Sequence, residues 1–373
     1  MSHINIPKMK NKFPGYIKKN EKEIKEIWDN GVICFDANVL LNLYRYSNDT
    51  RNALLDLIKR FSSQIFLPHQ SALEYNKNRY EVIADQEKAY KMFITSIDQI
   101  QKDLQTIRKP PFLSDKLHKS LNKVFKEVTA EVQNSISKYT NFMRDDKIYE
   151  DLSGIFEGKI TDEFSEKELS AIFKEGQSRF DNRIPPGFED EKTKKGVNKF
   201  GDLVLWKQMI RIGKSGKKPI IFITDERKID WWWKLKDGRN MGPRQELIEE
   251  MYLEAGVEFH MYSSERFLQY GLDRLEERKN DKALEEIAEL KKGELENIEL
   301  GKLKENSNAS RYIHSWVRNY YNIYGLKQET ITDKLIKKMF HELLQDHQFN
   351  NYKISMEIAE FFMLEALDDN IGS

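Results

Sequence analysis

The stretch CFDANVLLNLYRYS, residues 34–47, passes from a strand pattern to a helical one through Asp36 and Asn38. Residues 31–35 are apolar or β-branched and begin at a glycine, which predicts a short buried strand. From Val39 onward, apolar residues recur at helical spacing. Asp36 therefore stands where a strand gives way to a helix, which in a parallel α/β sheet is the edge that binds ligands. The pattern leaves a second interpretation open, in which Asp36 or Asn38 only caps the helix.

The same alternation of strand and helix returns later in the chain. Residues 64–68, 220–223 and 257–261 read as further strands, and 220–223 has the uninterrupted apolar character of a parallel strand. The intervening residues 76–180 are charged, with apolar positions at helical spacing, and predict a helical, coiled-coil-like insertion. We therefore expect an α/β domain from residues 1–75 and 181–272 and a C-terminal all-α region, 281–373, with a break near 305–310.

The composition bounds the class of protein. Of the 373 residues, 39% are hydrophobic and 33% charged, which suffices for a principal core and smaller helical parts. No apolar run approaches the roughly 20 residues that cross a bilayer. The first residues lack the apolar segment of an export signal. The single cysteine, Cys34, excludes an internal disulfide and a cysteine zinc cluster. We expect a cytoplasmic protein that makes no membrane contact.

The formal net charge of zero conceals an uneven distribution. Residues 192–244 contain fifteen Lys and Arg against five Asp and Glu, whereas residues 341–373 contain seven acids against one lysine. A basic band in a neutral chain indicates a local binding site for a polyanion, although it could also be a solvated basic face. The acidic C-terminal region could pack against that band, or could serve as an independent helical domain for a homo-oligomer or a regulatory protein partner.

Four acids stand at equivalent places in the predicted elements. Asp36 and Asp225 follow strands, and Glu74 and Asp202 lie in the first turns of helices. All four can meet at one edge of a parallel sheet. A cluster of carboxylates without soft ligands favours Mg²⁺ or Mn²⁺ over zinc. Carboxylates for a metal ion within a band of bases for phosphate indicate nuclease chemistry.

The chain resembles PIN-domain nucleases, and more closely a bacterial PIN-like family with a helical insertion. The resemblance lies in VICFDANVLLNLYRYS, FLPHQSALEYNKNR, RIPPGFEDEKTKKGVNKFGDLVLWKQMI, IIFITDERKIDWWW and GPRQELIEEMY, which together cover about 31–80 and 180–270. It implies a central parallel sheet flanked by helices. It also implies cleavage of RNA, or of DNA, with Mg²⁺ or Mn²⁺, and association with toxins or phage defence. Carried over residue by residue, the catalytic and metal-binding acids are Asp36, Glu74, Asp202 and Asp225.

Two departures from the family pattern bear on the site. The 128 residues from Glu74 to Asp202 exceed what a minimal PIN domain uses. The last motif contains Asp225, Glu226 and Asp230, so Glu226 or Asp230 could bind metal in place of Asp225 or beside it. Asn38 and Thr224 are expected to support the acids. The expected nucleic-acid contacts are Arg79, Lys194, Lys195, Lys199, Arg227, Lys228 and Trp231.

Three functions compete on these residues. The first is a metal-dependent nuclease, with RNA ahead of DNA because of the family resemblance. The second is a nucleic-acid-binding scaffold that keeps the fold without catalysis, against which four adjacent carboxylates argue. The third is a phosphatase of the Asp-x-Asp type, which the presence of Asn38 at the second acidic position argues against.

Overall fold

Four parallel strands form the central sheet of the molecule. The computed structural model describes residues 9, 13–105, 113–192, 194–324 and 333–346, and short stretches between 348 and 367. The strands β1 (Val32–Phe35), β2 (Ile65–Phe66), β3 (Ile220–Ile223) and β6 (Phe259–Tyr262) lie in the order β2-β1-β3-β6. Because all four run in the same direction, their carboxyl ends lie at one edge. The expected parallel sheet flanked by helices is confirmed.

Apolar helices cover both faces of this sheet. Val32 and Cys34 of β1 pack into the core that includes α9 (Gly201–Gly216) and α10 (Gln245–Ala255). Phe35 points to the opposite face, where its ring contacts Phe267 of α11 (Ser264–Arg274). Since successive strand residues face opposite sides, a strand covered on both sides is apolar throughout.

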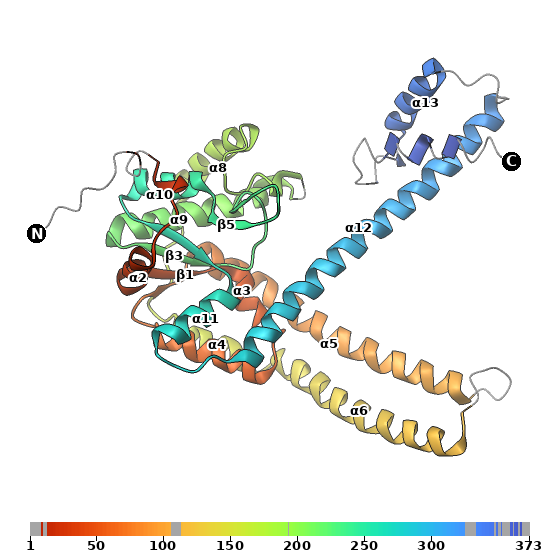
Figure 1. Ribbon diagram of the computed structural model, residues 1–373, viewed down its shortest axis with the longest axis horizontal. Helices are drawn as coiled ribbons and strands as arrows, with labels where there is room; N and C mark the ends of the chain where they lie inside the picture. The colour runs from red at the N-terminus through yellow and green to blue at the C-terminus, as the bar shows by residue number, and fades with distance from the viewer. Residues whose placement is uncertain are drawn as a thin grey trace, which may run out of the picture. The chain divides into compact units, whose positions relative to one another are not determined.

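The predicted helical insertion begins with two long helices. α5 (His69–Gln105) and α6 (Asp115–Phe142) pack side by side (Figure 1). The sequence Lys109-Pro110-Pro111 predicts a break in the helical pattern, and it lies outside the described residues. Tyr139 of α6 donates a 2.8 Å hydrogen bond to the carbonyl of Tyr44, which ties α6 to the α/β core. The insertion continues through α7 (Lys147–Ile155) and α8 (Glu166–Asp181). The short 3-10 helices η2 (Asp190–Lys192) and η3 (Gly196–Phe200) follow it.

The remaining elements of the α/β part are short. They are η1 (Pro14–Tyr16), α2 (Glu21–Asn30), α3 (Ala37–Asn42), α4 (Asn48–Arg60) and the antiparallel pair β4 (Trp232–Lys234) and β5 (Asn240–Pro243). The β4–β5 hairpin was not among the predicted strands.

The chain divides into two compact units, Met1–Ile287 and Ala288–Ser373. The second has its own apolar core, which includes Val317, Met339 and Leu343 from α12 (Asp281–Tyr324) and α13 (Asp333–Gln345). α12 is continuous through 305–310, so the expected break there is wrong; the segment contains neither Pro nor Gly to interrupt a helix. No described helix is both long and apolar enough to span a bilayer.

Candidate active site

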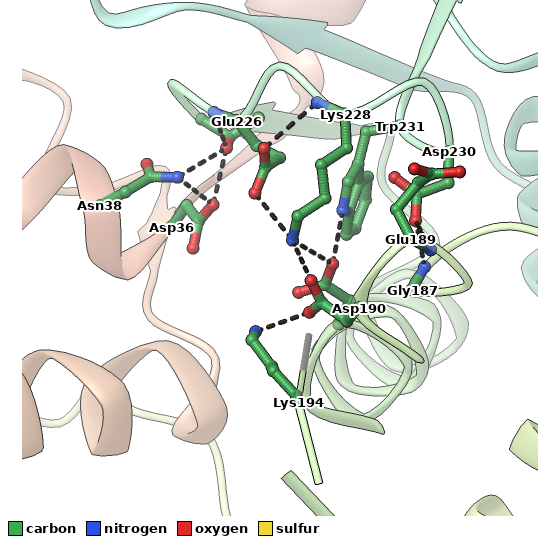
Figure 2. Close-up of polar contacts among 12 residues, drawn as sticks. Asp36, Asn38, Gly187, Glu189, Asp190, Lys194, Glu226, Lys228, Asp230 and Trp231 are labelled. Atoms are coloured by element: carbon green, nitrogen blue, oxygen red, sulfur yellow. Dashed lines mark hydrogen bonds and ion pairs between the residues drawn. The ribbon is translucent and has the colours of Figure 1, made fainter. Parts of the chain in front are cut away.

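Asp36 does not act as a simple helix cap. It occupies the N-cap position of α3, but its side chain makes no capping hydrogen bond to that helix. Instead, Asp36 Oδ2 accepts hydrogen bonds from Thr224 Oγ1 at 2.6 Å and from Asn38 Nδ2 at 2.8 Å (Figure 2). Asn38 Oδ1 in turn accepts from the backbone N–H of Asp225 at 3.1 Å. These contacts join the ends of β1 and β3 and fix the orientation of the Asp36 carboxylate.

Glu74 is held by a neighbour one helical turn away and lies against α9. Its Oε1 accepts a 2.6 Å hydrogen bond from Gln70 Nε2 in the first turn of α5. A Cβ atom at Gly201 would lie 3.0 Å from the same oxygen. The glycine before Asp202 therefore lets the start of α9 come close enough to bring Asp202 and Glu74 together.

Asp202 is supported by two donors from the segment after β3. Its Oδ2 accepts from the indole Nε1 of Trp231 at 3.1 Å and from the ammonium of Lys228 at 3.3 Å. Trp231, which we expected to contact nucleic acid, is only 2% exposed and packs edge-on against Trp206. It therefore has no free face on which a base could stack.

Asp225 and Glu226, the two acids after Thr224, contact different parts of the protein. Asp225 accepts hydrogen bonds from Asn42 Nδ2 at 3.1 Å and from the backbone N–H of Ser264 at 3.0 Å, and also from the Ser264 hydroxyl. These contacts tie Asp225 to α3 and to the first turn of α11. Glu226 instead contacts the ammonium of Lys228 at 3.0 Å, and its charge acts on Asp36. The structure thus brings Glu226 to the group formed by Asp36, Glu74 and Asp202, and engages Asp225 elsewhere.

A fifth acid, Asp190, was not among the predicted site residues. It is 2% exposed, and its two oxygens contact Lys228 at 2.7 Å and Lys194 at 2.6 Å (Figure 2). Asp190 lies in η2, where no strand or helix periodicity marks it. The one signal in the sequence is its place in the family-like segment 183–210, between the Pro-Pro-Gly turn and Asp202.

Asp230 holds the loop that carries Asp190. Its fully buried Oδ2 accepts from the backbone N–H groups of Gly187 at 3.0 Å and of Glu189 at 3.1 Å (Figure 2). Its other oxygen is buried and has no hydrogen-bond partner among the residues that the structure describes, and burial raises the pKa of Asp230 to about 6. The geometry makes Asp230 a clamp on the 187–190 loop.

The acids of the site disfavour one another's ionisation. Burial raises the pKa of Asp36 to about 7; the Thr224 hydrogen bond opposes the shift, and the charges of Glu74, Asp202 and Glu226 add to it. Burial also raises the pKa of Glu74 and of Asp202, with lysine charges opposing the shift. Carboxylates with raised pKa values at one sheet edge form a region of negative potential in which a cation is stabilised.

The chemistry of these side chains fits a hard divalent ion. Carboxylate oxygens are the ligands that Mg²⁺ and Mn²⁺ prefer. Asp36 Oδ1, Glu74 Oε2 and Asp202 Oδ1 accept no hydrogen bond from any residue that the structure describes. Within the described ranges, however, no three acidic, histidine or cysteine side chains are already arranged around a common metal position. The ammonium of Lys228 lies among three of the carboxylates instead.

The expected nucleic-acid contacts are divided between a groove and the protein interior. A groove of about 510 Å³ begins beside Glu74, and its lining includes Lys77, Lys194 and Lys195. Lys199 contacts Gln177 at 2.8 Å and Glu191 at 3.5 Å outside that lining.

Arg79 lies within 3.4 Å of Asp146, and its guanidinium packs over the rings of Tyr80 and Tyr149. These contacts tie α5 to the start of α7. Arg227 follows Glu226 and is half-buried.

One comparison with known proteins decides the family. A family model described as a PIN-like domain matches residues 32–247, more than half of the chain. The chain belongs to the PIN-like domain family. No curated protein and no solved structure gives a significant match. The matched range of this PIN-like domain runs from β1 into α10 and includes every acid described above, together with the helical insertion. Membership places the chain in a superfamily whose domains are generally nucleases, act on nucleic acids and typically use divalent metal ions.

Proposed function

We propose that this PIN-like domain is a Mg²⁺- or Mn²⁺-dependent nuclease that hydrolyses phosphodiester bonds in RNA. The observation that carries the proposal is the convergence of Asp36, Glu74, Asp202 and Glu226 from separate segments onto one edge of the sheet. The preference for RNA over DNA, and a role in toxicity or phage defence, follow from the family resemblance alone.

In this proposal, Asp36, Glu74 and Asp202 hold the divalent ion. When bound, such an ion polarises the phosphoryl group and activates water for in-line attack. Each acid has a neutral donor that orients it: Thr224 orients Asp36, Gln70 orients Glu74 and Trp231 orients Asp202. Asp202 also contacts the Lys228 ammonium at 3.3 Å.

The groove beside Glu74 is where the substrate would lie. Lys77, Lys194 and Lys195 line it and would contact phosphates without reading the sequence of the bases.

A catalytically inactive nucleic-acid-binding scaffold is the second candidate. The observation that favours it is Lys228, whose ammonium already neutralises part of the acidic group. A scaffold would bind nucleic acid equally well in Mn²⁺ and in EDTA and would cleave nothing.

A single assay separates these functions. Metal-depleted full-length protein is incubated with end-labelled RNA, single-stranded DNA, duplex DNA or a phosphate monoester, in Mn²⁺, Mg²⁺ or EDTA. We expect RNA cleavage with either ion, none in EDTA, and loss of cleavage in Asp36→Asn. Asp237→Asn is the matched control, because Asp237 is an exposed acid that pairs with Arg239 in the β4–β5 turn. Binding without cleavage would support the scaffold, and hydrolysis of the monoester alone would support a phosphatase.

A further inference from the structure

Lys228 has an environment unlike that of an ordinary surface lysine. Its ammonium contacts Asp190 at 2.7 Å, Glu226 at 3.0 Å and Asp202 at 3.3 Å (Figure 2). The three carboxylates come from η2, from the loop after β3 and from α9. A surface salt bridge usually joins one acid and one base and contributes little to stability. Here one positive charge instead holds three separate segments together.

The Lys228 ammonium contacts several carboxylates at once, as a bound metal ion would. A lysine has three N–H donors, and each can point to one of the three carboxylates. The three carboxylates contact two ammonium groups, Lys228 and, through Asp190 at 2.6 Å, Lys194, so they keep an excess of negative charge. The pocket around the ammonium therefore has both the ligand type and the charge of a site for a second cation.

The acidic group thus has two halves that share Asp202. In one half, Asp202 Oδ2 faces Lys228 together with Asp190 and Glu226. In the other, Asp202 Oδ1, Asp36 Oδ1 and Glu74 Oε2 accept no hydrogen bond from the described residues. In enzymes that use two ions, the metals lie about 3.5–4 Å apart, so the two halves of one acidic group can each hold an ion.

We propose that Lys228 takes the place of a second divalent ion, so that the chain binds one ion, held by Asp36, Glu74 and Asp202. This inference rests on the proposed metal-dependent function and specifies its stoichiometry. The tethered ammonium orders Asp190, Asp202 and Glu226 in the absence of metal. It also keeps a positive charge beside the ion, where a phosphate would be bound.

The number of ions bound per chain tests this inference independently of activity. The full-length protein is dialysed against EDTA, exchanged into metal-free buffer and titrated with MnCl₂ in a calorimeter. We expect one Mn²⁺ in the wild type, none in Asp36→Asn and two in Lys228→Met, whose side chain keeps an unbranched apolar stem without charge. The first ion should also bind about tenfold more tightly to Lys228→Met, because the variant removes a positive charge that repels the divalent ion.

Lys194→Met is the matched control, since it removes a lysine that contacts Asp190 and leaves Lys228 in place; it should bind one ion. Lys228→Arg keeps the charge and should also bind one ion. Circular dichroism establishes that each variant is folded, and Lys228→Gln replaces Lys228→Met if the latter is not. Two ions in the wild type, or one ion in both the wild type and the uncharged variant (Lys228→Met or Lys228→Gln), would overturn the inference and leave a metal-dependent nuclease intact. No ion in any of them would overturn both.

Discussion

The two adjacent acids after β3 offer a direct test of which one serves the active site. Glu226 contacts Lys228 and acts electrostatically on Asp36, whereas Asp225 is engaged by Asn42 and Ser264. We therefore predict that Glu226→Gln impairs cleavage and that Asp225→Asn impairs stability. Each substitution removes one charge and keeps the size of the side chain, so the two variants serve as controls for one another.

The contacts set the size of each effect. Glu226 Oε1 accepts hydrogen bonds from the backbone N–H groups of Arg227 at 2.7 Å and Lys228 at 3.1 Å. Glutamine at position 226 keeps a carbonyl oxygen that can accept both. The fold should therefore change little, while kcat/KM should fall at least about 10- to 100-fold, the loss that follows even from outer partners of a metal site. That loss corresponds to about 1.4–2.7 kcal/mol of transition-state stabilisation.

Asparagine at 225 cannot replace the carboxylate in the same way. Both oxygens of Asp225 accept hydrogen bonds, and the amide group of asparagine would place a donor against Ser264 or Asn42. Since hydrogen bonds to a charged group contribute about 1.5–3 kcal/mol each, we expect the free energy of unfolding to fall by about 2–3 kcal/mol. Cleavage per folded molecule should change by less than about tenfold.

Two measurements on Glu226→Gln and Asp225→Asn test these expectations. They are kcat/KM on labelled RNA in Mn²⁺ and urea unfolding of the metal-free protein. An inactive Asp225→Asn of normal stability beside an active Glu226→Gln would refute this assignment and make Asp225 the metal ligand.

Three further predictions follow from the same geometry. Asp230→Ala leaves the N–H groups of Gly187 and Glu189 without an acceptor, so urea unfolding should show a loss of about 2–4 kcal/mol, and Asp230→Asn a smaller one. Burial raises the pKa of Asp36 from its ordinary 3.8 to about 7, so between these values the folded protein binds a proton that the unfolded chain releases. The melting temperature in EDTA should therefore fall as the pH rises from about 4 through 7. Asp36→Asn should make this fall smaller. Glutamine substitutions at Lys194, Lys195 and Lys199 should lower the log–log salt slope of single-stranded RNA binding by about 0.7 for each phosphate that these lysines neutralise; an unchanged slope would assign them to a solvated surface.

The sheet could be predicted from sequence because its strands are short, apolar and separated by helical patterns. β1 and β3 contain no polar residue, and a polar residue follows each of them directly, Asp36 after β1 and Thr224 after β3. The edge of the sheet could therefore be predicted without a structure. The β4–β5 hairpin could not be predicted from sequence, because Trp231–Trp233 shows no alternation between apolar and polar positions.

The roles of individual acids depended on distant partners and could not be read from the chain. Asp225 and Glu226 are adjacent, and what separates them is Ser264, which lies 39 residues after Asp225. Asp190 is brought to the site by a loop that Asp230 holds through backbone N–H groups, at a sequence separation of 41 to 43 residues. Neither relation leaves a local pattern, because the partners are far apart in the sequence and several of the donors are backbone N–H groups.

The hydrogen-bond donors on Asp36 and Glu74 suggest why acidic residues occupy this edge of the sheet. A fold that needed only stability would pair each carboxylate with a base or replace it with a neutral residue, because like charges in a partly buried site are unfavourable. Here Asp36 and Glu74 are held by the neutral donors Thr224, Asn38 and Gln70, which fix the direction of each oxygen and leave its charge in place. Under the proposed function, this arrangement leaves negative charge that a divalent ion can neutralise.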